Sequence, residues 1–289
     1  MTGGATDTST SSAAEGPSGA GHVDVPNLPG HFYYADLNTT DVDAAQAFYG
    51  AMLGWTFEEI PGAPNRYVPA SVEDRPKAAI AGLDPELAAQ GVPPYWLPYL
   101  WVTSVDEVVA RTPELGGRVV VEPMDVFDMG RMAILEDPTG AAFGVWQDAQ
   151  PGQTTAKNEH GTPFWFELHT SDVDGALAFY RELVGWTTEP QDMGPEMTYH
   201  LIVPEQVDEL QTGAGGIMTQ MRQDREAGVP SRWFVYFHVD DTDAAFAKAI
   251  ELGAGAVMEP HDIPGAGRSC WITDPQGAYL AMMKPDPRQ

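Results

Sequence analysis

Two blocks of this sequence occur twice, in the same order, and this internal repeat limits the possible folds more than any other feature. The block at residues 38–58 returns at 169–189, and the block at 119–146 returns at 256–283. Solenoid repeats have much shorter periods, so each copy is expected to form a domain rather than a stacking unit. The repeat therefore predicts two similar domains in tandem.

The segments outside the repeat predict the domain boundaries. Residues 1–27 are rich in Gly, Ser, Thr and Ala and lack the basic and apolar regions of a secretion signal, which predicts a disordered tail. Residues 150–160 are polar and contain Gly and Pro, which is typical of a linker. We therefore expect the two domains to span residues 28–149 and 161–287.

Within a copy, the hydrophobic periodicity predicts an α+β domain. Residues 32–37 alternate as a strand does, and Thr40 or Asp41 then supplies an N-cap for an amphipathic helix that ends at Gly54. Further strands follow, and a second strand and helix, at 95–102 and 105–115, begin the pattern again. Each copy should thus contain two βαβββ modules, with a D-P-x-G hairpin turn near its end.

Charge and cysteine content exclude several classes of partner. The chain carries 42 acidic and 15 basic residues, a formal net charge of −27, which repels phosphate backbones and anionic membranes. No apolar stretch approaches the ~20 residues that span a bilayer, and the single cysteine, Cys270, allows no internal disulfide. We therefore expect a cytoplasmic protein with a small-molecule ligand and with neither nucleic acid nor membrane as a partner.

The helix motif A-F-Y-x-x-x-L-G-W and the D-P-x-G turn resemble the vicinal oxygen chelate superfamily, which includes glyoxalase I, extradiol dioxygenases, and bleomycin- and fosfomycin-resistance proteins. The resemblance covers nearly all of residues 30–285. It implies two tandem glyoxalase-like domains, each built of paired βαβββ modules that form curved sheets around a cup. Because two fused copies supply what single-module relatives obtain by dimerising, a monomer is the default expectation and a homodimer the alternative.

Many members of the superfamily hold a divalent metal in the cup, and the resemblance allows this site to be checked. The positions that match the metal ligands are occupied by Tyr34, Leu97 and Gly144 in copy 1 and by Trp165, Phe234 and Ala281 in copy 2. None of these residues offers an imidazole, carboxylate or thiolate donor. We therefore predict that the protein has no metal site at these positions and needs no cofactor.

Residues two and four away from a ligand position share its face of the strand, which predicts what lines the cups. We expect the ligand to contact a set of mostly aromatic residues: Tyr34, Asp36, Tyr99, Trp101, Trp146, Trp165, Phe234, Tyr236 and Tyr279. The same alternation places Phe32 on this face. Such a lining favours a flat, partly aromatic ligand. The alternative is that the rings simply fill the cup as hydrophobic core.

Three polar residues of copy 2, Glu167, His169 and His238, are predicted to converge as a catalytic acid/base group. The alternatives are a structural hydrogen-bonded set and a displaced site for iron. Asp36, which matches Glu167, could join it in binding a cationic ligand. Arg131 and its repeat counterpart Arg268 are more simply explained as structural bridges, to Glu122 or Asp125 and to Glu259 or Asp262.

These observations lead to three functional hypotheses. The first is a metal-independent protein that binds an aromatic or polyketide-like metabolite in a cleft between the copies, as a binding or self-resistance protein. The second is a cofactor-free isomerase, lyase, cyclase or oxygenase of secondary metabolism, with Glu167 and His238 as the acid/base pair. The third is a metal-dependent lactoylglutathione lyase or dioxygenase.

Overall fold

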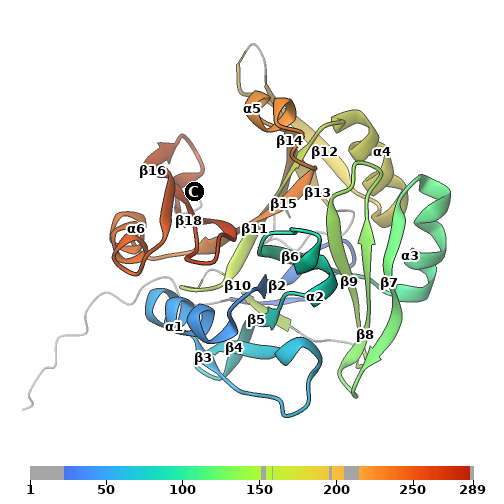
Figure 1. The fold of residues 1–289 in the computed structure, drawn as a ribbon. Coiled ribbons are helices and arrows are strands. Elements are labelled where there is room, and N and C mark those ends of the chain that lie inside the picture. The colour runs from blue at the N-terminus through green and yellow to red at the C-terminus, as the bar shows by residue number, and fades with distance from the viewer. Residues whose placement is uncertain (1–22, 151–153, 158, 195–196, 205–214, 287–289) are drawn as a thin grey trace, which may run out of the picture.

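The computed structural model describes residues 23–150, 154–157, 159–194, 197–204 and 215–286. Each copy forms one mixed, eight-stranded sheet, and the strand order is the same in both. In copy 1 the order is β3-β4-β5-β2-β6-β9-β8-β7, so the first module supplies one half of the sheet and the second module supplies the other. The predicted α+β fold of two tandem domains, each with paired βαβββ modules, is confirmed (Figure 1).

The elements of copy 1 follow the predicted order. They are β2 (Phe32–Thr39), α1 (Val42–Leu53), β3 (Thr56–Phe57), β4 (Val68–Val72), β5 (Arg75–Gly82), α2 (Pro85–Ala89), β6 (Tyr95–Trp101), α3 (Val105–Arg111), β7 (Arg118–Val126), β8 (Gly130–Glu136) and β9 (Ala142–Asp148). Single 3-10 turns lie at Pro64–Arg66 and Pro113–Leu115.

Copy 2 repeats this order with its own bounds. Its elements are β11 (Pro163–Thr170), α4 (Val173–Val184), β12 (Thr187–Asp192), β13 (Thr198–Val203), β14 (Gly215–Thr219), α5 (Arg222–Glu226), β15 (Arg232–His238), α6 (Thr242–Glu251), β16 (Gly255–Ile263), β17 (Gly267–Thr273) and β18 (Tyr279–Pro285).

The first helix of each copy begins and ends where its sequence predicts. Asp41 caps α1 by accepting a hydrogen bond from the Ala44 amide at 3.0 Å, which satisfies one of the free N–H groups of the first turn. Gly54 ends the helix in the left-handed region, at φ 70°, where a residue without a Cβ meets no steric penalty. Asp172 and Gly185 do the same for α4.

Two short strands lie in segments that were expected to be irregular. β1 (Val23–Pro26) pairs antiparallel with β10 (Thr154–Lys157). The prediction of a disordered tail is therefore wrong for residues 23–26, and the predicted linker contains a strand; residues 1–22 lie outside the described residues. The backbone hydrogen bonds that these two segments make with each other were not visible in either segment alone.

The two copies pack against each other through one continuous hydrophobic core. This core contains the buried faces of helices α1, α3, α4 and α6 and one face of each sheet. At its centre the rings of Phe32 and Phe166 stack at 4.4 Å. Helix α1 lies beside α6, and α3 beside α4, so each module contacts the opposite module of the other copy (Figure 1). The space between the copies is thus filled, and the predicted cleft between them is wrong.

Paired hydrogen bonds across this interface show that the copies are related by an approximate two-fold axis. Tyr49 on α1 donates to Asp274 at 2.9 Å, and its counterpart Tyr180 on α4 donates to Asp137 at 3.2 Å. Both carboxylates belong to the D-P-x-G turns. All four side chains are buried. The superfamily motif therefore forms the interface between the copies rather than a ligand site.

A β-bulge explains one error in the predicted strand alternation. The register between β2 and β6 shifts between Phe32 and Tyr34, and the same shift occurs between Pro163 and Trp165 in copy 2. An extra residue at a bulge reverses the faces of the residues before it. Phe32 consequently points into the shared core and not into the cup.

Among the described residues, no helix is both long and apolar enough to cross a bilayer.

Candidate functional site

The face of each sheet that points away from the shared core is called here the cup face. On β2, Ala35 and Leu37 belong to the shared core, so Tyr34 and Asp36 lie on the cup face. Several rings on the two cup faces, among them Tyr34 and Trp165, are half-buried and so keep accessible surface. The cup faces of the two copies look away from each other, and each is a separate candidate site.

In copy 1 the cup face is built around the carboxylate of Asp36, which is only 7% exposed. Tyr67 donates its phenol hydrogen to the Asp36 carboxylate at 3.2 Å, and Tyr99 is a second hydrogen-bonding partner. Burial raises the pKa of Asp36 to about 7, although the two tyrosine hydrogen bonds favour the charged form and lower it. Near neutral pH this carboxyl group can therefore either accept or donate a proton.

In copy 2 the corresponding carboxylate is Glu167, which is also buried. It lies 2.7 Å from the Nε2 atom of His169 and accepts a hydrogen bond from Tyr236 at 3.3 Å. Tyr199 also hydrogen-bonds to Glu167 and accepts a bond from the indole of Trp165 at 2.9 Å. Burial, followed by the charge of Glu167, raises the pKa of Tyr199 and Tyr236, which keeps both as phenols.

The two copies thus share a carboxylate–tyrosine cluster, defined here as Asp36, Tyr67 and Tyr99 in copy 1 and Glu167, Tyr199 and Tyr236 in copy 2. The carboxylates, Tyr99 and Tyr236 were predicted from the sequence as site residues. Tyr67 and Tyr199 were not. These two residues lie at the start of β4 and β13, in a region where the repeat is too weak to align. The sequence did contain a signal for them: each copy has a tyrosine at the beginning of this strand, Tyr67 just before β4 and Tyr199 within β13.

Glycines make room for the tyrosine rings. A Cβ atom at Gly216 on β14 would come within 2.0 Å of the Tyr199 hydroxyl, and one at Gly144 on β9 would come within 2.3 Å of the Tyr99 ring. Contacts this short do not occur in folded proteins, so any side chain at either position would displace the ring. These glycines therefore determine where the phenols of the carboxylate–tyrosine cluster lie.

The ligand positions of metal-dependent relatives do not fit a metal in this protein. Gly144 occupies one of these positions, and the ring of Tyr99 lies where its side chain would be. Within the described ranges, no three His, Cys, Asp or Glu side chains come together as a metal-binding group. In copy 1 the nearby oxygens belong to one carboxylate and to phenols whose pKa is raised by burial, which is a poor donor set for zinc or iron.

The structure corrects the predicted catalytic triad of copy 2. Glu167 and His169 are in contact, but His238 pairs with Thr162 at the far end of β15, whereas Glu167 lies opposite Phe234. Four residues along a strand amount to about 13 Å, so His238 cannot act on a group held by Glu167. The displaced two-histidine site for iron is wrong for the same reason. Burial lowers the pKa of His238.

The predicted ligand-binding residues are divided between the copies. In copy 1, Trp101 and Trp146 each donate an indole hydrogen to Asp148, at 2.7 Å. In copy 2, Trp165 packs with Tyr236 in a cluster of its own. These four rings therefore cannot stack on one ligand. Asp36 and Glu167 lie on the cup faces of different sheets, which look away from each other, so the two carboxylates cannot bind one cation together.

Copy 2 also carries a guanidinium on its cup face. Arg232, at the start of β15, lies over the rings of Phe234 and Tyr279, with its Cζ atom 4.8 and 4.7 Å from the two ring centres. Trp271 and His169 contact Phe234 from the other side, at 4.7 and 4.5 Å between ring centres. The predicted ligand-binding residues Phe234 and Tyr279 thus both lie below a cation, but Phe234 is only 4% exposed and Tyr279, at 39%, offers the accessible ring.

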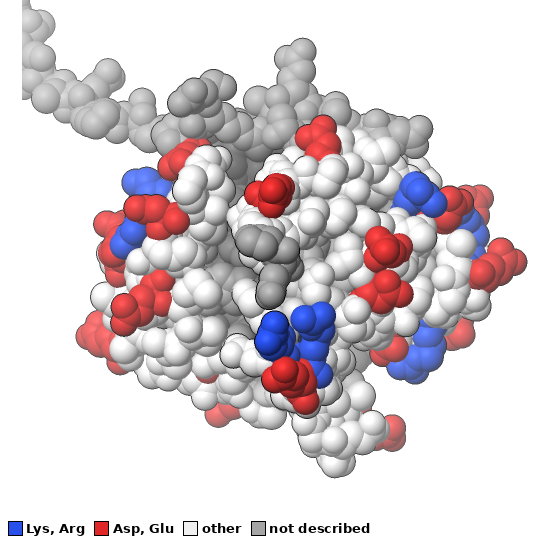
Figure 2. Space-filling model, turned by 90° about the horizontal axis from the view of Figure 1, so that it is seen from above, with Lys and Arg blue, Asp and Glu red and all other residues white. Residues whose placement is uncertain are grey.

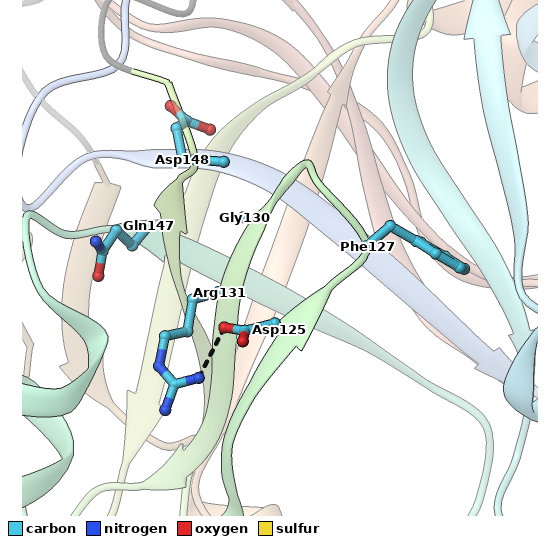
Figure 3. Close-up of a pocket in the computed structure, with 7 residues that line it drawn as sticks. Asp125, Phe127, Gly130, Arg131, Gln147 and Asp148 are labelled. Carbon is cyan, nitrogen blue, oxygen red and sulfur yellow. Dashed lines mark hydrogen bonds and ion pairs between the residues drawn. The ribbon is translucent and has the colours of Figure 1, made fainter.

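A hollow of about 260 Å³ lies at the end of the β7–β8 hairpin, where Asp148 of β9 also lines it (Figure 3). None of the predicted ligand-binding residues lines it. Arg131 extends beside it and pairs with Asp125 at 2.7 Å and with Asp106, while Phe127 points away from this pair. Arg268 pairs in the same way with Asp262, at 2.9 Å. The prediction that these two arginines are structural bridges is confirmed for Asp125 and Asp262.

On the face seen in Figure 2, acidic side chains are spread rather than gathered at one site, with basic side chains interspersed among them. The formal net charge of the whole chain is −27. What a ligand meets on a cup face is set by the few charged groups described above.

Comparison with known proteins agrees with this geometry. The family model "Glyoxalase-like domain" matches residues 34–146 and 165–282, one match for each copy. "Putative glyoxylase CFP32" of Mycobacterium tuberculosis is 40% identical over 89% of this chain and 95% of its own length. "Anthracycline biosynthesis protein DauV" of a Streptomyces species is 31% identical over 89% of this chain and 94% of its own.

The fold is also similar to that of solved structures. The Mn(II)-bound glyoxalase from Novosphingobium aromaticivorans superimposes with a TM-score of 0.58 at 17% identity, and the match covers 92% of this chain and 87% of that one. At this identity the likeness concerns the fold alone. It does not carry over the manganese, because the metal-ligand positions of this chain are filled by other residues.

Proposed function

The chain belongs to the glyoxalase-like family of the vicinal oxygen chelate superfamily, and from this premise we propose that it binds a small hydroxylated aromatic metabolite on its cup faces, without a metal, as a binding or self-resistance protein. The observation that supports this is the carboxylate–tyrosine cluster, which occurs in both copies at the site where relatives hold a metal. A ligand with phenol or quinone oxygens can exchange hydrogen bonds with these groups while its rings contact the half-buried aromatics.

The names of two relatives support an aromatic, polyketide-like ligand. Two of them, DauV and DnrV, are named anthracycline biosynthesis proteins, and anthracyclines contain a planar, hydroxylated polyketide ring system. This chain spans 94% of the length of each. A polyketide-like ligand would match both the flat aromatic surface and the hydrogen-bonding groups of the cup faces.

Binding can be tested by titrating the protein with a dihydroxyanthraquinone and following tryptophan fluorescence, with and without a metal chelator. We expect saturable quenching that the chelator does not change. Tyr236→Phe should weaken binding about three- to ten-fold, because one net hydrogen bond contributes about 1 kcal/mol. Phe127→Ala, in an exposed ring outside the cup faces, is the matched control. Absence of binding, or binding that the chelator abolishes, would contradict the proposal.

A second candidate function is acid/base catalysis in copy 2. The 2.7 Å contact between His169 and Glu167 favours it, because a carboxylate beside an imidazole is a usual acid/base pair. This proposal replaces the predicted partner His238 by His169. The proton would be taken from an acidic carbon or phenol of the bound aromatic molecule, which needs neither metal nor cofactor.

Deuterium exchange tests this second function without requiring the natural substrate. The acidic methylene of anthrone exchanges its protons with D2O, and NMR measures the rate with and without protein. We expect the protein to accelerate exchange, and Glu167→Gln to lose most of this acceleration, in the range of about a hundred-fold or more. His238→Ala should leave it unchanged. Acceleration that survives Glu167→Gln would refute the catalytic role.

A further inference from the structure

The two cup faces share the carboxylate–tyrosine cluster but differ in the residues next to it. Arg232 of copy 2 occupies the position that Tyr95 occupies in copy 1, at the start of the equivalent strand. His169 likewise corresponds to Asn38. In copy 2 His169 lies opposite Arg232 across β11 and β15, and in copy 1 Asn38 lies opposite Tyr95 across β2 and β6. We propose that the cup face of copy 2 binds an aromatic carboxylate through Arg232, whereas that of copy 1 accepts only uncharged aromatic molecules.

This inference rests on the proposed function and adds a ligand class for one of the two sites. It predicts that duplication has produced two sites of different selectivity within one chain. Binding of a carboxylate to copy 2 alone requires that the Arg232 guanidinium be available, that the charge of Glu167 be engaged elsewhere, and that copy 1 lack a cation at the same place.

The guanidinium of Arg232 is available for an anion. Its side chain is 32% exposed, and the nearest carboxylate oxygen, that of Asp224 on α5, is 3.9 Å away. This distance exceeds that of a hydrogen bond, so the fork of N–H donors is not saturated. The rings of Phe234 and Tyr279 lie under the guanidinium and hold its plane over the cup face.

The carboxylate of Glu167 does not neutralise Arg232. It already accepts hydrogen bonds from Tyr236, at 3.3 Å, and contacts the His169 imidazole at 2.7 Å. His169 lies directly opposite Arg232 in the β11–β15 ladder and so separates the guanidinium from the carboxylate. A carboxylate that enters beside Arg232 therefore meets the guanidinium before it meets the charge of Glu167.

Copy 1 offers the opposite environment at the equivalent place. Tyr95 and Asn38 are opposed across β6 and β2 and carry no charge, while Asp36, two residues along β2, is charged when it is ionised. The cation of Lys77 on β5 is buried and already paired with Glu159. An anion placed there would gain no ion pair and would be repelled by the ionised Asp36. Uncharged hydroxylated rings avoid both costs, so the two sites separate ligands by charge.

The shape of the copy 2 site matches a flat ring that bears a carboxylate. A carboxylate can take two parallel hydrogen bonds from a guanidinium, while its ring continues over Tyr279, which is 39% exposed and lies 4.7 Å below the Arg232 guanidinium. A point-like ammonium would not give this planar geometry. The ligand would thus be held by the guanidinium at one end and by the carboxylate–tyrosine cluster at the other.

The test compares two matched probes, an anthraquinone carboxylate and its carboxamide, by isothermal titration of the full chain. We expect the wild-type protein to bind the carboxylate about ten- to a hundred-fold more tightly than the carboxamide. Arg232→Gln should remove this preference and leave carboxamide binding within about two-fold. Asp224→Asn should tighten carboxylate binding, because the competing carboxylate is removed. Tyr95→Phe, at the equivalent position of copy 1, is the matched control.

Each outcome separates this inference from the function on which it rests. If both probes bind equally and Arg232→Gln changes neither affinity, the sites do not differ in charge selectivity, although the proposed binding function stands. If neither probe binds the wild-type protein, the proposed function fails and this inference fails with it. A far-UV circular dichroism spectrum of Arg232→Gln checks folding, and the Asp224→Asn variant tests the same guanidinium without removing it.

Discussion

At the scale of single residues, the two cup-face carboxylates have the same place in the fold but different partners. Asp36 is hydrogen-bonded by Tyr67 and Tyr99, and burial outweighs these bonds and raises its pKa to about 7. Glu167 contacts His169 as well as tyrosines. In Asp36 the phenol donors favour the ionised carboxylate and offset the effect of burial only in part.

The raised pKa of Asp36 predicts how stability depends on pH. In the unfolded chain this group titrates near 4, so between about pH 4 and pH 7 the folded state binds more protons than the unfolded chain. A rise in pH through this window therefore lowers the free energy of unfolding. Asp36→Asn removes the titration, so its stability relative to wild type should increase by on the order of 3 kcal/mol between about pH 5 and about pH 8.

Urea unfolding followed by circular dichroism at these two pH values measures the difference directly. Any pH-independent cost of replacing the carboxylate by an amide cancels when the two pH values are compared. Asp128→Asn, in an exposed residue of the β7–β8 turn, is the control and should show no such change. An Asp36→Asn difference that is the same at both pH values would mean that the pKa of this carboxyl is not raised.

At the scale of elements, the motif that carries the family resemblance is used for assembly. The tyrosine of A-F-Y on α1 and the aspartate of the opposite D-P-x-G turn bond to each other in the core between the copies. The tryptophan of the same motif, Trp55, donates to the Gly161 carbonyl at 2.9 Å, and Trp186 donates to the Gly30 carbonyl at 2.7 Å. In this protein the residues of the most recognisable sequence motif therefore stabilise the packing between the copies.

The β-bulges in β2 and β11 explain where strand alternation fails to predict the face of a residue. Strict alternation along residues 32–36 assigns Phe32 and Asp36 to one face, but the bulge separates them. The same irregularity near Trp165 leaves Glu167 and His169 on the cup face as alternation predicts, since both follow the bulge. Alternation was thus reliable only for residues on one side of the bulge, because one extra residue exchanges the faces of everything beyond it.

At the scale of the whole molecule, the two copies behave as the two subunits of a dimer joined in one chain. Tyr49 of copy 1 meets Asp274 of copy 2, while Tyr180 of copy 2 meets Asp137 of copy 1. Such reciprocal contacts are those of an isologous two-fold interface. Because both copies bury their helices in it, their cup faces must look outward, and two separate sites result.

This symmetry predicts the behaviour of an isolated copy. A chain of residues 28–149 retains both Tyr49 and Asp137, so two such chains can form the same reciprocal pairs. We expect it to be a dimer by size-exclusion chromatography with light scattering, because a monomer would expose the core face that carries Phe32. Phe32→Asp should prevent dimerisation. A stable, soluble monomer of residues 28–149 would contradict this account.

The sequence by itself determined the duplication and the βαβββ modules, because these depend on residue identity and local spacing. Only the tertiary structure decided that the copies pack back to back, that His238 lies far from Glu167, and that Tyr67 and Tyr199 complete the clusters. These facts depend on strand register, bulges and the contacts of segments far apart in the chain. A hydrophobic face shows that a strand packs against something, but its partner is set by the global assembly.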